Sequence, residues 1–156
     1  MYSPNETFMT LLQEPINSSA HEEAIHYFAE AKKTFQNLRQ IIQRLSGFMI
    51  LFQSQKLLKA ETVAAYEFGK PLLEETLEEL GNLKVPPIAR SHFHALQLAA
   101  HCLQQFYQIK RDFNSKDDSS LILLEKAYTA LKSTSGFSNG LNMISLDASC
   151  ACGHHH

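Results

Sequence analysis

The chain has 156 residues, of which 44% are hydrophobic and 19% are charged, and its formal net charge is −2 at pH 7. This composition is typical of one folded domain and argues against an intrinsically disordered chain. The balance of 14 basic and 16 acidic residues also argues against nucleic-acid binding, which usually requires a basic face.

The sequence shows no targeting signal and no membrane segment. The start of the chain lacks the basic and apolar regions of a signal peptide. The longest apolar run, Phe48–Phe52, is far shorter than the roughly 20 residues that span a bilayer. The three cysteines do not form a disulfide framework. We therefore expect a cytoplasmic protein that does not bind a membrane.

The first predicted elements are a short helix over Tyr2–Gln13 and then the dominant helix of the chain. Ser19 and Glu22 have the spacing of a capping box, and the dominant helix is expected to run from there to about Lys56. Its apolar residues recur at alternating steps of four and three, which places them on one helix face. They are Ala24, Phe28, Ala31, Phe35, Leu38, Ile42, Leu45, Met49 and Phe52.

Gly47 is the one weak position inside this helix. A glycine in a helix interior costs roughly 1 kcal/mol relative to alanine. The apolar pattern nevertheless keeps its phase across Gly47, from Leu45 to Met49. We therefore expect a bend or a close helix contact at this position rather than a break.

Four shorter helices are predicted in the rest of the chain. Pro71 is expected to separate a short helix over Leu57–Gly69 from a second over Pro71–Leu83, because proline is tolerated only in the first turn. Two more are predicted over Pro87–Phe113 and up to about Ser133. The second of the four has an acidic outer face near its N-terminal end, where negative charge suits the helix dipole: Glu74, Glu75, Glu78 and Glu79.

The composition changes after Thr134, where no helical period continues. The predicted organisation is a helical bundle domain over residues 1–134 and an irregular tail over residues 135–156. The predicted fold class is all-α, an antiparallel four-helix-type bundle with a short N-terminal helix and an irregular C-terminal tail. The dominant helix, about 38 residues or roughly 55 Å long, exceeds its partners in length. Either a second subunit or the tail is expected to cover the part left exposed, around Phe48–Phe52, and we predict a homodimer.

The end of the tail is the densest group of soft metal ligands. Two cysteines separated by one residue and a run of histidines suit Zn²⁺ or Cu(I): Cys150, Cys152, His154, His155 and His156. A terminal run of histidines is also typical of an affinity tag, and the two cysteines could instead form a strained disulfide. These alternatives stay open.

The other chemistry-bearing residues fit structural roles better. Glu23 and His26 have the spacing found in di-iron bundles, but the motif does not occur a second time. His94 and His101 share one face of a predicted helix, and no carboxylate three or four residues earlier orients either ring. There is neither a nucleophile elbow nor a phosphate-binding glycine loop, so no enzyme activity is expected.

Two functional hypotheses from different classes follow. The first is a non-catalytic interaction module that binds a protein partner or a second copy of itself. The alternative is a metal-handling protein that binds, stores or delivers Zn²⁺ or Cu(I) through its tail. A more distant third is a small-molecule carrier built on aromatic residues: Phe48, Phe52, Phe106 and Tyr107.

Overall fold

The computed structural model describes residues 18–53, 64, 66–109 and 119–135, and these residues form helices and turns with no strand. The elements are α1 (Ser18–Gln53), α3 (Gly69–Asn82), the short 3-10 helix η1 (Pro87–Ala89), α4 (Arg90–Gln108) and α5 (Ser119–Ser133). The predicted helix over Tyr2–Gln13 and the predicted tail, apart from Ser135, lie outside the described residues.

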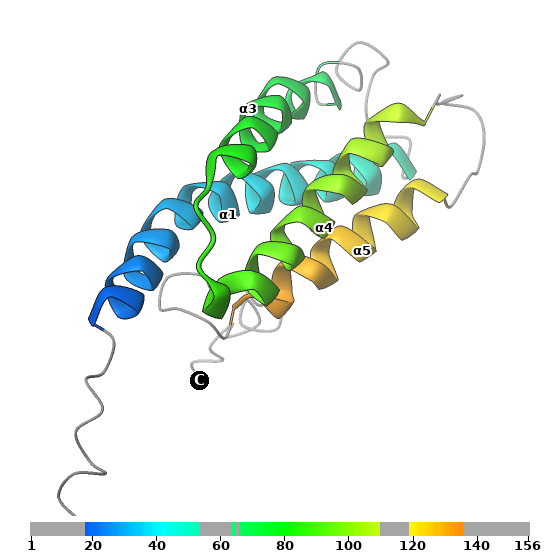
Figure 1. Ribbon diagram of the computed structural model, residues 1–156. Helices are drawn as coiled ribbons and strands as arrows, with labels where there is room; N and C mark the ends of the chain where they lie inside the picture. Colours follow the sequence, from blue (N-terminus) through cyan, green and yellow to red (C-terminus); the bar gives the residue numbers. More distant parts are fainter. Residues whose placement is uncertain (1–17, 54–63, 65, 110–118, 136–156) are drawn as a thin grey trace, which may run out of the picture.

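The four long helices run alternately up and down, so that neighbouring helices are antiparallel (Figure 1). α1 packs between α3 and α5, and α4 packs between the same two helices on the other side. η1 joins the end of α3 to the start of α4 and also contacts α1. The predicted all-α antiparallel bundle is confirmed. None of the described helices combines the length and apolar character needed to cross a membrane.

α1 buries a wider face than its apolar stripe alone provides. The central residues of the stripe, from Ala31 to Met49, are at most 8% exposed, and its end residues are half-buried. A second buried row runs beside the stripe at steps of seven: Tyr27, Thr34, Ile41 and Phe48. α1 contacts every other helix of the bundle, and one narrow stripe cannot cover three neighbours.

The residues expected to be uncovered near the end of α1 are only partly so. Phe48 is 3% exposed and Met49 is 8% exposed. The ring centroid of Phe48 lies 6.1 Å from that of Tyr66. Ile50, by contrast, is 67% exposed. The exposed surface here is therefore smaller than the sequence suggests.

Two helix starts differ from the predictions. α1 already includes Ser18, so Ser19 lies inside the first turn and not at the predicted cap position, and its hydroxyl lies 3.5 Å from the carboxylate of Glu23. α3 begins at Gly69 instead of Pro71, because a proline in the first turn replaces an amide that has no helical partner. Phe68, directly before α3, already has helical backbone angles.

The end of α4 and the acidic residues of α3 can also be compared with the predictions. α4 ends at Gln108, where Ile109 turns extended, and the predicted continuation toward Phe113 lies outside the described residues. The first turn of α3 contains no acidic residue, so the predicted dipole role of its glutamates is wrong.

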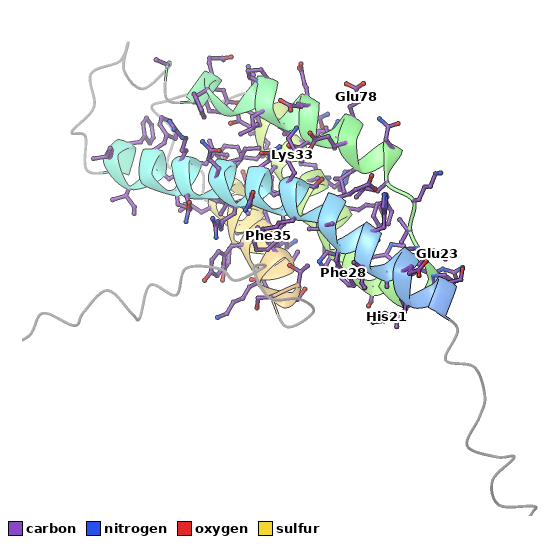
Figure 2. The ribbon with its side chains drawn as sticks, turned by 90° about the vertical axis from the view of Figure 1, so that its left-hand side faces the viewer. His21, Glu23, Phe28, Lys33, Phe35 and Glu78 are labelled. Atoms are coloured by element: carbon purple, nitrogen blue, oxygen red, sulfur yellow. The ribbon has the colours of Figure 1, made fainter. Side chains whose placement is uncertain are left out.

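Two of these glutamates instead join α3 to α1. The ammonium of Lys33 lies 3.0 Å from a carboxylate oxygen of Glu75 and also contacts Glu79. Figure 2 shows Lys33 on the side of α1 that faces α3, with Glu78 on the outer side of α3. The hydrogen bonds that Lys33 donates, first to Glu79 and then to Glu75, raise the pKa of its ammonium to about 12.

Replacing Lys33 with glutamine should lower the melting temperature only slightly, by about 1–3 °C, because exposed ion pairs contribute little. The loss should shrink in high salt, which screens the pair in the wild type. Thermal unfolding followed by circular dichroism, at low and high salt, measures both effects. A salt-independent loss would show that packing of the Lys33 stem matters more than its charge.

Candidate functional site

The candidate site is a small surface on the outer side of α1, near its C-terminal end. We call it the Gly47 surface, and its members are Gln43, Arg44, Gly47, Ile50 and Phe68. The first four share one helix face, because residues three and four apart are neighbours on a helix. Phe68 belongs to the chain that enters α3, and its ring centroid lies 3.9 Å from the guanidinium carbon of Arg44.

Two apolar side chains of this surface are exposed to solvent. Ile50 is 67% exposed and Phe68 is 43% exposed. Single exposed apolar residues are common on protein surfaces and need no special account. Ile50 follows Gly47 by three residues, and Phe68 contacts Arg44, which precedes Gly47 by three, so these residues form one cluster.

Gly47 is not explained by the packing of the fold. A Cβ atom added at Gly47 would meet no atom within 4 Å, and the residue does not have the positive φ angle that favours glycine. Its side of α1 is therefore open, while glycine still costs the helix roughly 1 kcal/mol. A glycine on an open helix face leaves room for the backbone of another element to approach closely.

Replacing Gly47 with alanine should stabilise the isolated chain by about 0.5–1 kcal/mol, because alanine favours the helix and the added methyl group has free space. Urea unfolding measures the gain. Gly69→Ala provides the contrast, because a Cβ atom at Gly69 would collide with Tyr107. A loss of stability in Gly47→Ala would mean that the fold itself requires this glycine.

A second notable group, at the opposite end of the bundle, is a buried pair of polar side chains. The Tyr27 hydroxyl lies 2.8 Å from Nδ1 of His92, and both residues are 0% exposed. The Phe28 ring packs edge-on against the imidazole, at 5.0 Å between centroids. The pair fastens the first turn of α4 to α1.

Burial determines the protonation state of this pair. It lowers the pKa of His92 to about 4 and raises the pKa of Tyr27 above its usual range. At neutral pH both groups are therefore uncharged, and one hydrogen bond joins the phenol oxygen of Tyr27 and Nδ1 of His92. The pair combines a hydroxyl with a base, but a substrate cannot reach it, so we interpret it as structural.

The aromatic residues of the carrier hypothesis do come together at the Gly47 end of the bundle. Phe48 stacks on Phe52 at 5.9 Å, and Phe106 contacts Tyr107 at 5.6 Å. Tyr66, which the sequence reasoning missed, lies between the two pairs, 4.9 Å from Tyr107. The rings pack on one another and form part of the core.

The structure places the two predicted helix histidines at the surface. His94 and His101 are both exposed on α4, whereas Cys102 next to them is buried, and burial raises the pKa of its thiol. His26 is exposed, and its Nδ1 lies 3.5 Å from a carboxylate oxygen of Glu30. Both side chains therefore belong to a solvent-exposed face of α1. In the part of the chain that the structure describes, no three metal-ligating side chains form a group.

The predicted metal ligands of the tail lie outside the described residues. These are Cys150, Cys152, His154, His155 and His156. Their metal binding stays a prediction from the sequence.

The comparisons with known proteins give no information about this site. No family model matches the chain. Searches for similar curated proteins and for similar solved structures also found no match.

Proposed function

We propose that this chain is a non-catalytic interaction module that binds another protein chain through the Gly47 surface. The observation that carries the proposal is Gly47 itself, an open glycine within a helix that costs stability and has no packing role inside the fold. The exposed side chains of Ile50 and Phe68 beside it supply apolar area for a contact.

The chemistry of the surface fits a protein contact. The centres of interfaces are poor in charged residues and enriched in aromatic residues and arginine. The Gly47 surface contains one aromatic ring, one arginine and no acidic residue. Because Arg44 packs over the ring of Phe68, its charge is held at the edge of the surface.

A matched pair of glycine variants tests the proposal. Gly47→Gln fills the open face of α1, whereas Gly81→Gln adds the same side chain to α3, where a Cβ atom also meets nothing within 4 Å. Wild-type protein and both variants are immobilised and exposed to a lysate or to purified copies of the chain. Bound proteins are then identified by mass spectrometry.

The proposal expects the same bound protein with wild type and Gly81→Gln, and at least a tenfold loss with Gly47→Gln, which corresponds to about 1.4 kcal/mol. Ile50→Asp should give a similar loss, because it places a charge at the edge of the contact. Equal binding by all four proteins, or binding by none, would contradict the proposal.

The metal-handling function remains the second candidate, and the ligand density of the tail sequence supports it. If it is correct, protein purified without a metal column will contain close to one equivalent of Zn or Cu. Cys150→Ser/Cys152→Ser will have lost that metal. Elemental analysis of both proteins measures this, and a metal-free wild type would rule the function out.

A further inference from the structure

The part of α1 that carries the Gly47 surface is basic. From Ala31 to Gln53 the helix contains no acidic residue, and it contains four basic ones: Lys32, Lys33, Arg39 and Arg44. The charge of Lys33 is offset by its ion pairs with two glutamates of α3. In the part of the chain that the structure describes, Lys32 and Arg44 form no ion pair. This stretch is therefore positive, although the whole chain has a net charge of −2.

Arg44 is the basic residue of the Gly47 surface, and its side chain is held in place by a ring. Its guanidinium carbon lies 3.9 Å from the centroid of the Phe68 ring. Among the described residues its N–H groups have no acceptor. An arginine stacked on a ring keeps a planar fork of donors, which matches the two oxygens of a carboxylate. The contact with Phe68 therefore prepares Arg44 to bind an acidic side chain.

The acidic residue next to this surface in the sequence is bound to a different cation. Glu67 directly precedes Phe68, and its carboxylate accepts a hydrogen bond of 2.9 Å from the ammonium of Lys70. That ammonium also lies 5.3 Å from the centroid of the Tyr66 ring. Because Lys70 occupies the carboxylate of Glu67, the charge of Arg44 is left for a group of another molecule.

Three features of the surface together define the chemistry of its partner. The guanidinium of Arg44 is complementary to a carboxylate. The exposed side chain of Ile50 is complementary to an apolar residue. The open face at Gly47 allows the partner backbone to approach α1 closely, so that a short acidic side chain can reach the guanidinium. A helix with an acidic and an apolar residue one turn apart presents both groups on one face.

A nucleic acid fits this surface less well than an acidic protein does. Proteins bind phosphate backbones through many basic residues that act together. The Gly47 surface contains one arginine, and its other members are uncharged. The exposed side chain of Ile50 would also meet no apolar group on a phosphate backbone.

We propose that the Gly47 surface binds an acidic amphipathic helix of another protein. A carboxylate of that helix pairs with Arg44, and an apolar side chain one turn away packs against Ile50. The proposal rests on the proposed function and names the chemistry of its partner. The positive charge of this part of α1 also steers such a helix toward the surface.

Selection from a displayed library of random helical peptides tests the proposal without assuming a sequence for the partner. Wild-type protein is the target, and peptides that also bind Gly47→Gln are removed by counter-selection. The enriched peptides should carry aspartate or glutamate one turn from an apolar residue. Enrichment of basic or uncharged peptides, or no enrichment, would overturn the acidic partner.

Variants of Arg44 then test the pairing with the most enriched peptide, by fluorescence anisotropy. Arg44→Gln should weaken binding by about tenfold or more, and Arg44→Lys should also weaken it, because lysine lacks the planar fork. Replacing the acidic residue of the peptide with its amide should give a similar loss, without a further loss in combination with Arg44→Gln.

The control for these variants is Arg90→Gln, the same substitution at the exposed first residue of α4. It should bind the peptide as tightly as wild type. Wild-type affinity in Arg44→Gln or in Arg44→Lys would overturn the pairing, and so would losses that add independently in the combined variant.

The two proposals can fail separately. Enriched peptides that are not acidic, but that Gly47→Gln fails to bind, would overturn the acidic partner and leave the interaction module standing. Dimerisation of wild type in sedimentation velocity, lost in Gly47→Gln, would do the same. A DNA duplex that binds wild type but not Arg44→Gln, with no peptide enriched, would overturn a protein partner. A surface that binds neither a peptide nor a protein would overturn both proposals.

Discussion

Lowering the pH from 7 to 4 will cost the wild-type fold about 3 kcal/mol more than it costs a His92→Gln variant. The imidazole of His92 has a pKa of about 4 in the folded chain, where Tyr27 and Phe28 surround it, and about 6.5 when unfolded. Between these two values the unfolded chain binds a proton that the folded chain does not bind. The stability from the neutral imidazole is therefore complete above about pH 6.5 and is lost as the pH falls toward 4.

Urea unfolding at pH 4, 5, 6 and 7 measures this dependence, and the comparison uses slopes, so a constant cost of the substitution at pH 7 does not matter. Carboxylates titrate in the same range but contribute equally to both proteins. His94→Gln is the control, because His94 is exposed on the same helix. If wild type and His92→Gln lose stability in parallel, the imidazole of His92 is not buried in its neutral form.

Replacing Gly69 with alanine will destabilise the fold by about 1–3 kcal/mol, a typical cost of overpacking. At the start of α3 the backbone of Gly69 lies against α4. A Cβ atom there would collide with the Tyr107 hydroxyl and lie 3.3 Å from Cζ of the same ring. The Tyr107 ring also packs against Tyr66 and Phe106, with ring centroids 4.9 Å and 5.6 Å away, so it has little room to move away.

A double-mutant cycle isolates this contact. Tyr107→Phe removes the oxygen that the new methyl group would meet, so the cost of Gly69→Ala should fall by more than half in that background. Free energies of unfolding in urea give the four corners of the cycle. An equal cost of Gly69→Ala in both backgrounds would show that the hydroxyl is not the obstacle.

The bundle could be predicted from the sequence because the apolar residues of its helices recur with the period of a helix. The apolar stripe of α1 needs only the spacing of its residues, and the alternation of helices and polar or proline-containing joints implies an antiparallel arrangement. The helix ends were less predictable. Pro71 marks a helix start correctly to within a turn, but the sequence does not indicate that α3 begins two residues earlier.

The buried pair of Tyr27 and His92 was missed for a physical reason. The helical spacing of Phe93, Leu96, Ala99 and Leu103 favours Phe93 as an inward residue of α4, yet Phe93 is half-buried while His92 is fully buried. The hydrogen bond with Tyr27 offsets the cost of burying the imidazole, and the two residues are 65 positions apart in the sequence. A single sequence contains no signal for that pairing.

The sequence indicated only one part of the Gly47 surface, the glycine itself. A glycine in a long helix with an unbroken apolar pattern predicts a bend or a close contact. The sequence does not show which side of the helix is free or that Phe68 is brought beside Arg44. Those facts come from the packing of Phe68 and Tyr66, which precede α3, against Arg44 and Phe48 of α1.

Photo-crosslinking tests the role of the Gly47 surface most directly. A photoreactive amino acid replaces Ile50 in one variant and Glu78 in another, and cells that produce each variant are irradiated. The account predicts a specific covalent adduct from position 50 and none from position 78. The absence of any adduct from position 50, or the same adducts from both positions, would contradict a binding role for this surface.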